Sequence, residues 1–127
     1  MKYIIDSYAW VEYLDGTSEG QKVREILMQN NEIYTLILSI AEVISRTKRK
    51  EGDIDIAYKA IISNSRILPI NQEMSKEAGL LHAEIRKEIK DFGLIDAFIL
   101  LTARKLNLKV LTGDSHFKDF KEAVLIT

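Results

Sequence analysis

Cysteine is absent from this chain of 127 residues. Its absence excludes disulfide bonds, thiolate nucleophiles and sulfur-ligated zinc, and it fits the reducing environment of the cytoplasm. Long apolar runs are absent too, since no stretch approaches the ~20 residues that a membrane span needs. The apolar segment 3–5 is interrupted by Asp6, so it does not form a signal peptide. We therefore expect a soluble, cytoplasmic protein with no membrane contact.

The chain also lacks an excess of charge of either sign. Its 18 lysines and arginines nearly balance 19 aspartates and glutamates, which gives a net charge of −1. Any binding of nucleic acid must therefore come from a local basic patch or from a bound metal ion. With 46% hydrophobic residues, the length suits one domain, residues 1–127, around a single core.

Proline and glycine are scarce, and neither a linker nor an internal repeat is present. Pro69 is the only proline, and it lies in the apolar segment 67–70. Because proline cannot donate to a central ladder, we assign this segment to a strand near a sheet edge. Other short apolar segments, most of them rich in β-branched residues, also predict strands. They are residues 3–5, 35–38, 109–111 and 123–126.

Longer segments with helical spacing of apolar residues separate these strands. The spaced positions are Val23, Ile26 and Leu27; Ile54, Ala57, Ile61 and Ile62; and Ala78, Leu81, Ile85 and Ile89. Segment 94–108 is apolar on nearly every face, as expected of a deeply buried helix. The alternation of strands and helices predicts an α/β domain with a mostly parallel sheet of about five strands.

Acidic residues stand at or just beyond the ends of the predicted strands. Asp6 ends the first strand, Glu42 lies one helical turn past the second, and Asp114 follows the strand at 109–111. Asp96 opens the buried helix. In an open parallel sheet, ligands bind beyond the carboxyl ends of the strands, where loops and helix N-termini converge. We therefore expect these side chains to meet at one edge of the sheet.

Each acid also has a purely structural interpretation. Asp6 and Asp96 are suited to cap helix N-termini, where a carboxylate accepts backbone N–H bonds. Glu42 could pair with Arg46, four residues further along a helix. Asp114 could be a turn residue that follows a glycine. Taken singly, each acid is explained by these roles.

Taken together, the acids favour a metal site. Four converging carboxylates would repel one another, so they must become protonated or bind cations. A donor set of oxygens alone suits Mg²⁺ or Mn²⁺. Two such ions about 4 Å apart hydrolyse phosphodiesters by activating water and stabilising the leaving oxygen.

Other chemistries of α/β domains lack their motifs here. The chain has no phosphate-binding G-x-x-x-x-G-K-[ST] loop, no dinucleotide-binding G-x-G-x-x-G turn and no G-x-S-x-G nucleophile elbow. His82 and His116 are the only histidines, and we expect structural roles for both. Tyr8 occupies the position at which an Asp-x-Asp phosphatase would need its second acid.

Three blocks of the sequence resemble the PIN domain family and, within it, the VapC toxins of toxin–antitoxin pairs. The most specific block is GLIDAFILLTARKLNLKVLTGDSHF, residues 93–117, with its Asp-Ala helix and Thr-x-Asp-x-x-Phe ending. The opening YIIDSYAWVEYL and the later ILSIAEV resemble the family's first strand and its Ser-x-x-Glu segment. The three blocks occur in the family's order along essentially the whole chain.

The resemblance implies a three-layer α/β/α sandwich and a metal-dependent endoribonuclease that a small antitoxin neutralises. It also implies a homodimer. The acidic metal ligands, with Mg²⁺ or Mn²⁺ as cofactor, would be Asp6, Glu42, Asp96 and Asp114. Polar residues beside them would hydrogen-bond the carboxylates or metal-bound water. These are Ser7, Ser39 and Thr112, for which helix capping or turn formation is the alternative.

The densest basic run offers a surface for RNA. It spans residues 46–50 and includes the candidate RNA contacts Lys48, Arg49 and Lys50, although such runs are usually solvated helix faces. We expect Glu12 and Asp119 to face solvent. Two other functions stay open: a PIN-fold nuclease of RNA processing or of DNA strands, and a non-catalytic module that binds RNA or a partner.

Overall fold

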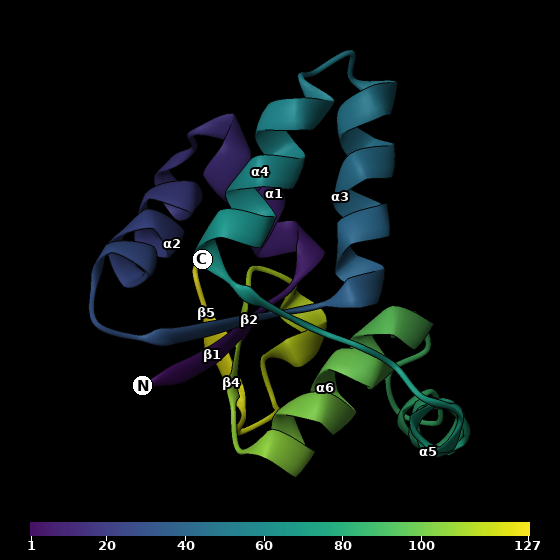
Figure 1. The fold of residues 1–127 in the computed structure, drawn as a ribbon. Coiled ribbons are helices and arrows are strands. Elements are labelled where there is room, and N and C mark those ends of the chain that lie inside the picture. Colours follow the sequence, from purple (N-terminus) through teal and green to yellow (C-terminus); the bar gives the residue numbers. More distant parts are fainter.

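The computed structural model describes all residues, 1–127. Its centre is a sheet of five parallel strands in the order β3-β2-β1-β4-β5 (Figure 1). The strands are β1 (Lys2–Ile5), β2 (Glu32–Leu36), β3 (Arg66–Leu68), β4 (Lys109–Thr112) and β5 (Ala123–Leu125). The strand order reverses between β1 and β4, and this reversal is the usual position of a ligand site in a doubly wound sheet.

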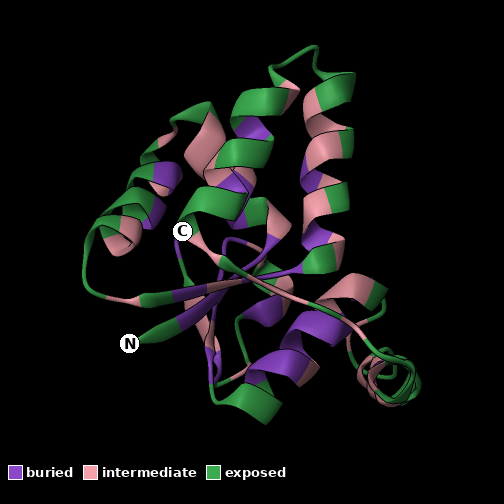
Figure 2. Ribbon diagram, in the orientation of Figure 1, coloured by how far each residue is buried: buried purple, intermediate pink, exposed green.

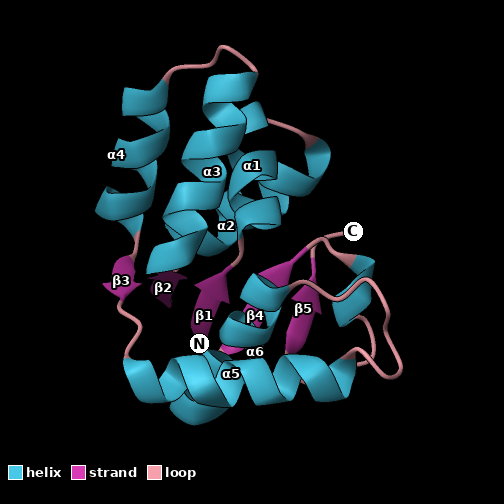
Figure 3. Ribbon diagram, turned by 90° about the vertical axis from the view of Figure 1, so that its right-hand side faces the viewer, coloured by secondary structure: helices cyan, strands magenta, loops and turns pink.

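Helices cover both faces of the sheet and make the predicted α/β/α sandwich. They are α1 (Ser7–Asp15), α2 (Ser18–Met28), α3 (Ile37–Arg49), α4 (Ile54–Asn64), α5 (Gln72–Ile85) and α6 (Leu94–Leu106), with a short 3₁₀ helix η1 (Ser115–Phe117). Figure 3 shows α1 to α4 on one side of the sheet and α5 and α6 on the other. No helix is long and apolar enough to cross a membrane.

The strand β1 shows why the core divides in two. Tyr3 and Ile5 point into the core beneath α1 to α4, whereas Ile4 points into the core beneath α5 and α6. Because successive side chains of a strand alternate between faces, a central strand with a helical layer on each side must be apolar throughout. Figure 2 shows the resulting buried centre, which includes the middle of α6.

The sequence predictions hold for the element types and fail at some boundaries. The strand with Pro69 lies at a sheet edge as predicted, and the proline follows β3 directly. The predicted strand 35–38 is wrong at its end, because Ile37 and Leu38 begin α3. Branched side chains there favour a strand, but the pairing of β2 with β3 ends at Leu36. Ile89 lies beyond the end of α5 and not on it.

Candidate functional site

A cleft of about 410 Å³ opens at the carboxyl edge of the sheet. The sequence-predicted acids all line it, each from a different part of the fold. Asp6 follows β1 and Asp114 follows β4, Glu42 lies in the second turn of α3, and Asp96 lies in the first turn of α6. The full lining is Asp6, Ser7, Tyr8, Val11, Glu12, Glu42, Arg46, Arg49, Asp96 and Asp114.

Asp6 caps a helix and lines the cleft at the same time. Its carboxylate accepts the Ala9 N–H at 2.8 Å and so caps α1, and its residue surface is only 2% exposed. The pKa of Asp6 is raised to about 7, mainly by burial and also by the charges of Asp96 and Asp114. Hydrogen bonds from Thr112 and from the Ala9 N–H oppose this rise. The capping role and a place in the acidic cleft are therefore compatible.

Asp96 is not the N-cap of α6, and the capping interpretation of this residue is wrong. Gly93 is the N-cap, and Asp96 follows it in the first helical turn. The pKa of Asp96 is raised to about 7, mainly by burial and also by the charges of Asp114 and Glu42. His116 and the Gly93 N–H lower it. Asp96 is thus a partly buried carboxylate held among other acids.

Asp114 is placed by its neighbours on both sides. Its N–H donates to the Thr112 hydroxyl at 3.0 Å, and its carboxylate caps η1 by accepting the His116 N–H at 2.9 Å. Nδ1 of His116 lies 3.3 Å from the same carboxylate oxygen. The structural role expected for His116 is therefore accompanied by direct contact with an acid of the cleft.

Glu42 does not make the ion pair that its spacing on the helix suggests. Arg46 contacts Asp15 on α1 at 3.6 Å instead. The Ser7 hydroxyl bonds to the Glu42 carboxylate and lowers its pKa, while partial burial, the larger effect, raises it. Glu42 faces α1 because the cleft lies between α1 and α3, and Ser7 stands at the start of α1.

The polar residues predicted beside the acids differ in their surroundings. Ser7 and Thr112 bond to carboxylates of the cleft. Ser39 is fully buried, and its hydroxyl has no hydrogen-bond partner, so it reaches none of the acids. Its position one turn before Glu42 places it on the inner face of α3, which packs on the sheet.

Sequence reasoning missed part of the cleft wall on α1. Tyr8, Val11 and Glu12 line the cleft, although Glu12 was expected to face solvent. The spacing of these residues, at i, i+3 and i+4, is the signal that could have found them once Asp6 was placed. The Tyr8 ring lies against Gly113, and a Cβ at that position would collide with it. Any larger residue between Thr112 and Asp114 would therefore force the Tyr8 ring to move. Asp119 is exposed, as predicted.

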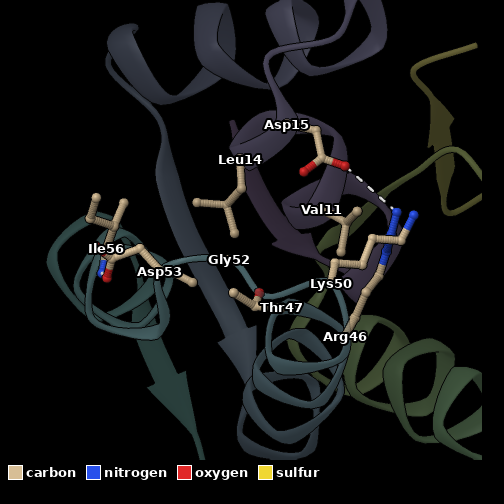
Figure 4. Close-up of a pocket in the computed structure, with 10 residues that line it drawn as sticks. Val11, Leu14, Asp15, Arg46, Thr47, Lys50, Gly52, Asp53 and Ile56 are labelled. Carbon is tan, nitrogen blue, oxygen red and sulfur yellow. Dashed lines mark hydrogen bonds and ion pairs between the residues drawn. The ribbon is translucent and has the colours of Figure 1, made fainter.

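Positive charge reaches the acidic cleft from one helix. Arg46 and Arg49, one turn apart on α3, both line it. Of the predicted RNA contacts, Lys48 lines neither this cleft nor the neighbouring one, and Lys50 lines the neighbouring cleft of about 460 Å³. Figure 4 shows this second cleft between α1, α3 and the start of α4, with the pair between Arg46 and Asp15.

The donor set of the acidic cleft fits a hard divalent cation. All its potential ligands are carboxylates and hydroxyls, and burial together with the neighbouring acids raises the pKa values of Asp6 and Asp96 to about 7, so a cation would stabilise their ionised forms. No three His, Asp or Glu side chains form a ready-made metal cage. Mg²⁺ does not need one, because it keeps several of its waters and commonly takes one or two protein carboxylates.

The fold and the cleft define the class of protein: an α/β/α domain with acidic side chains at the carboxyl edge of a parallel sheet. The model of the PIN domain family matches residues 3–123 of the chain. The chain therefore belongs to the PIN domain family. No curated protein matches it in sequence.

Solved structures share the fold at low sequence identity. A toxin–antitoxin complex from Klebsiella pneumoniae superimposes with a TM-score of 0.74, at 22% identity over 98% of each chain. VapBC2 from Rickettsia felis, bound to a DNA fragment from its promoter, superimposes with a TM-score of 0.72. The sequence identity is 22%, over 98% of this chain and 97% of the other. VapC20 of Mycobacterium tuberculosis, a toxin that cleaves the sarcin–ricin loop, superimposes with a TM-score of 0.74. The sequence identity is 15%, over 91% of this chain and 92% of the other.

Proposed function

We propose that this protein is a metal-dependent endoribonuclease of the VapC toxin type, which hydrolyses RNA phosphodiester bonds. The observation that supports the proposal is the meeting of Asp6, Glu42, Asp96 and Asp114 in one cleft from separate parts of the fold. Burial, and to a lesser extent mutual repulsion, disfavours the ionised forms of these carboxylates without a cation, and both effects raise the pKa values of Asp6 and Asp96 to about 7. Such an arrangement is expected where the acids serve a ligand.

The acids would hold Mg²⁺ or Mn²⁺. When bound, such a cation activates water and stabilises charge on the phosphate oxygens. Thr112 would fix the direction of the Asp6 carboxylate through its hydroxyl, and Ser7 would do the same for Glu42. Arg49, at the rim, would contact an RNA phosphate and position the strand across the cleft.

The toxin assignment rests on relatives of the same fold. The structures from Klebsiella pneumoniae and Rickettsia felis are toxin–antitoxin complexes, and the VapC20 toxin cleaves the sarcin–ricin loop. By analogy, this protein would pair with a small antitoxin in the cytoplasm and form a homodimer. The exposed apolar side chains of α4, Ile56, Tyr58 and Ile62, are available for such contacts.

Incubation of the purified protein with RNA and DNA oligomers of equal sequence tests the activity. Each is offered with Mg²⁺, with Mn²⁺ and with EDTA. Cleavage of RNA alone, and only with metal, supports the proposal. Equal cleavage of DNA would replace it with a general nuclease. RNA binding without cleavage in either metal would favour the non-catalytic module.

A further inference from the structure

The loop 86–93 carries the chain from α5 to α6 and ends three residues before Asp96. Its backbone bonds are local, and the Phe92 N–H, for example, donates to the Ile89 carbonyl. One side-chain bond ties the end of the loop to the body of α5: Nε2 of His82 lies 2.9 Å from the Phe92 carbonyl oxygen. A carbonyl only accepts, so Nε2 carries the proton and donates it.

The carbonyl that His82 binds belongs to the same peptide group as the Gly93 N–H. This group is planar, so fixing the direction of its C=O also fixes the direction of its N–H. The Gly93 N–H faces the Asp96 carboxylate and lowers the pKa of that acid. Asp96 Oδ2 lies back over the peptide, only 3.1 Å from the place that a Cβ on Gly93 would occupy.

The packing of the Phe92 side chain does not fix the orientation of the Phe92–Gly93 peptide. The ring is fully buried, and its centroid lies 5.4 Å from that of Phe117 and 5.7 Å from that of Phe120. Phe117 belongs to η1, which Asp114 caps, so the aromatic cluster anchors the loop beside a second acid of the cleft. Ring packing holds the Phe92 side chain, whereas the His82 bond orients the peptide that follows.

We propose that His82 is a positioning residue for Asp96: its bond to the Phe92 carbonyl turns the Phe92–Gly93 peptide so that the Gly93 N–H faces the Asp96 carboxylate. A directed N–H donor leaves that carboxylate with one preferred orientation toward the cleft. The consequence for a metal ion rests on the proposed function. The orientation of the peptide does not, and it is measurable in the metal-free protein.

A merely structural role would have a different signature. His82 is half-buried on the last turn of α5, and its ring also fills space between α5 and the loop. If the role of His82 were only to fill this space, any side chain of similar length could replace it. His82→Gln retains an N–H donor at about the reach of Nε2, and His82→Met has similar length without a donor. Leu81→Ala weakens the packing of α5 while keeping the histidine.

The experiment records the amide proton shift of Gly93 in the metal-free protein and the dissociation constant for Mn²⁺, by titration calorimetry. We expect the Gly93 amide to move upfield in His82→Met and Mn²⁺ binding to weaken about tenfold, in the range for partners of metal ligands. His82→Gln should restore both, and Leu81→Ala should change neither. An unchanged Gly93 amide in His82→Met overturns the inference, as does Mn²⁺ binding of wild-type strength in that variant. If the wild-type protein binds no Mn²⁺, the proposed function and the metal consequence fail together, and the Gly93 shift alone decides the orientation of the peptide.

Discussion

The hydroxyl of Thr112 on β4 faces the carboxylate of Asp6, which follows β1, and lowers the pKa of that acid. The parallel register, in which Ile5 pairs with Leu111, brings these two residues side by side at the ends of their strands. The same hydroxyl oxygen accepts the Asp114 N–H at 3.0 Å. One buried threonine thus links two acids of the cleft.

Replacement of Thr112 by valine should destabilise the protein and further raise the pKa of Asp6. Valine has the same shape but removes one of the hydrogen bonds to the buried Asp6 carboxylate and leaves the Asp114 N–H without its partner, which costs about 1–3 kcal/mol. Urea unfolding at pH 8 measures this loss. Thr112→Ser retains the hydroxyl and should lose less than half as much. If the two variants lost equal free energy of unfolding, the effect would come from packing and not from the hydroxyl.

The stability of the metal-free protein should fall as pH rises from about 4 to 7. The folded-state pKa of Asp6 is about 7, and its ordinary value is 3.8, so the folded protein holds a proton that the unfolded chain releases. The penalty is absent below the unfolded pKa and complete above the folded one, where it amounts to about 4 kcal/mol. Asp6→Asn keeps a side chain that caps helices well and removes the charge.

Urea unfolding in EDTA at several pH values tests this dependence. Asp6→Asn should be more stable than the wild type at pH 8, and the difference should vanish as the pH falls below the ordinary pKa of 3.8, because the wild-type carboxyl is then protonated in both states. A wild-type protein that is as stable as Asp6→Asn at pH 8 would show that Asp6 carries no penalty for its burial.

Metal binding should release protons near neutral pH. Asp6 and Asp96 are partly protonated around pH 6.5, because both have a pKa of about 7, and only the ionised carboxylates bind a cation. Calorimetric titration with Mn²⁺ in buffers of different ionisation enthalpy counts these protons. We expect a release that shrinks toward zero at pH 8.5. Binding heats that do not depend on the buffer at pH 6.5 would contradict the raised pKa values.

RNA binding should depend on Arg49 more than on its neighbour Lys48. Both are basic residues on α3, but only Arg49 lines the acidic cleft. In an inactive background, Arg49→Ala should weaken binding and reduce the slope of log affinity against log salt by about 1. Lys48→Ala is the matched control and should leave the slope unchanged. Fluorescence anisotropy across a salt series measures both, and identical slopes would remove Arg49 from the interface.

The sequence predicted the fold well because its signals were local. Short apolar segments and helical spacing are properties of neighbouring residues, and they predicted an α/β domain with a parallel sheet. The error at 35–38 arose where these signals conflict: Ile37 and Leu38 favour a strand by themselves, but the pairing of β2 ends before them. Where a strand stops depends on its partner strand, which a single sequence does not reveal.

The acids were predictable because each lies close to the end of a strand, and parallel strands end at one edge. The rotation of each helix about its axis, which decides where its side chains point, was not predictable. Arg46 turns toward Asp15, Glu12 turns into the cleft and Ser39 turns into the core. Each of these directions depends on how α1 and α3 pack against each other and on the sheet, so local spacing did not determine them.

Comparison of Asp96→Asn with Asp119→Asn tests the central claim most directly. Both changes remove one carboxylate charge with little change of shape, but Asp96 lines the cleft and Asp119 is exposed outside it. We expect Asp119→Asn to bind Mn²⁺ and cleave RNA like the wild type, and Asp96→Asn to remain folded while losing metal-dependent cleavage by at least about a hundredfold. Full metal-dependent cleavage by Asp96→Asn would contradict the assignment of the acidic cleft as the active site.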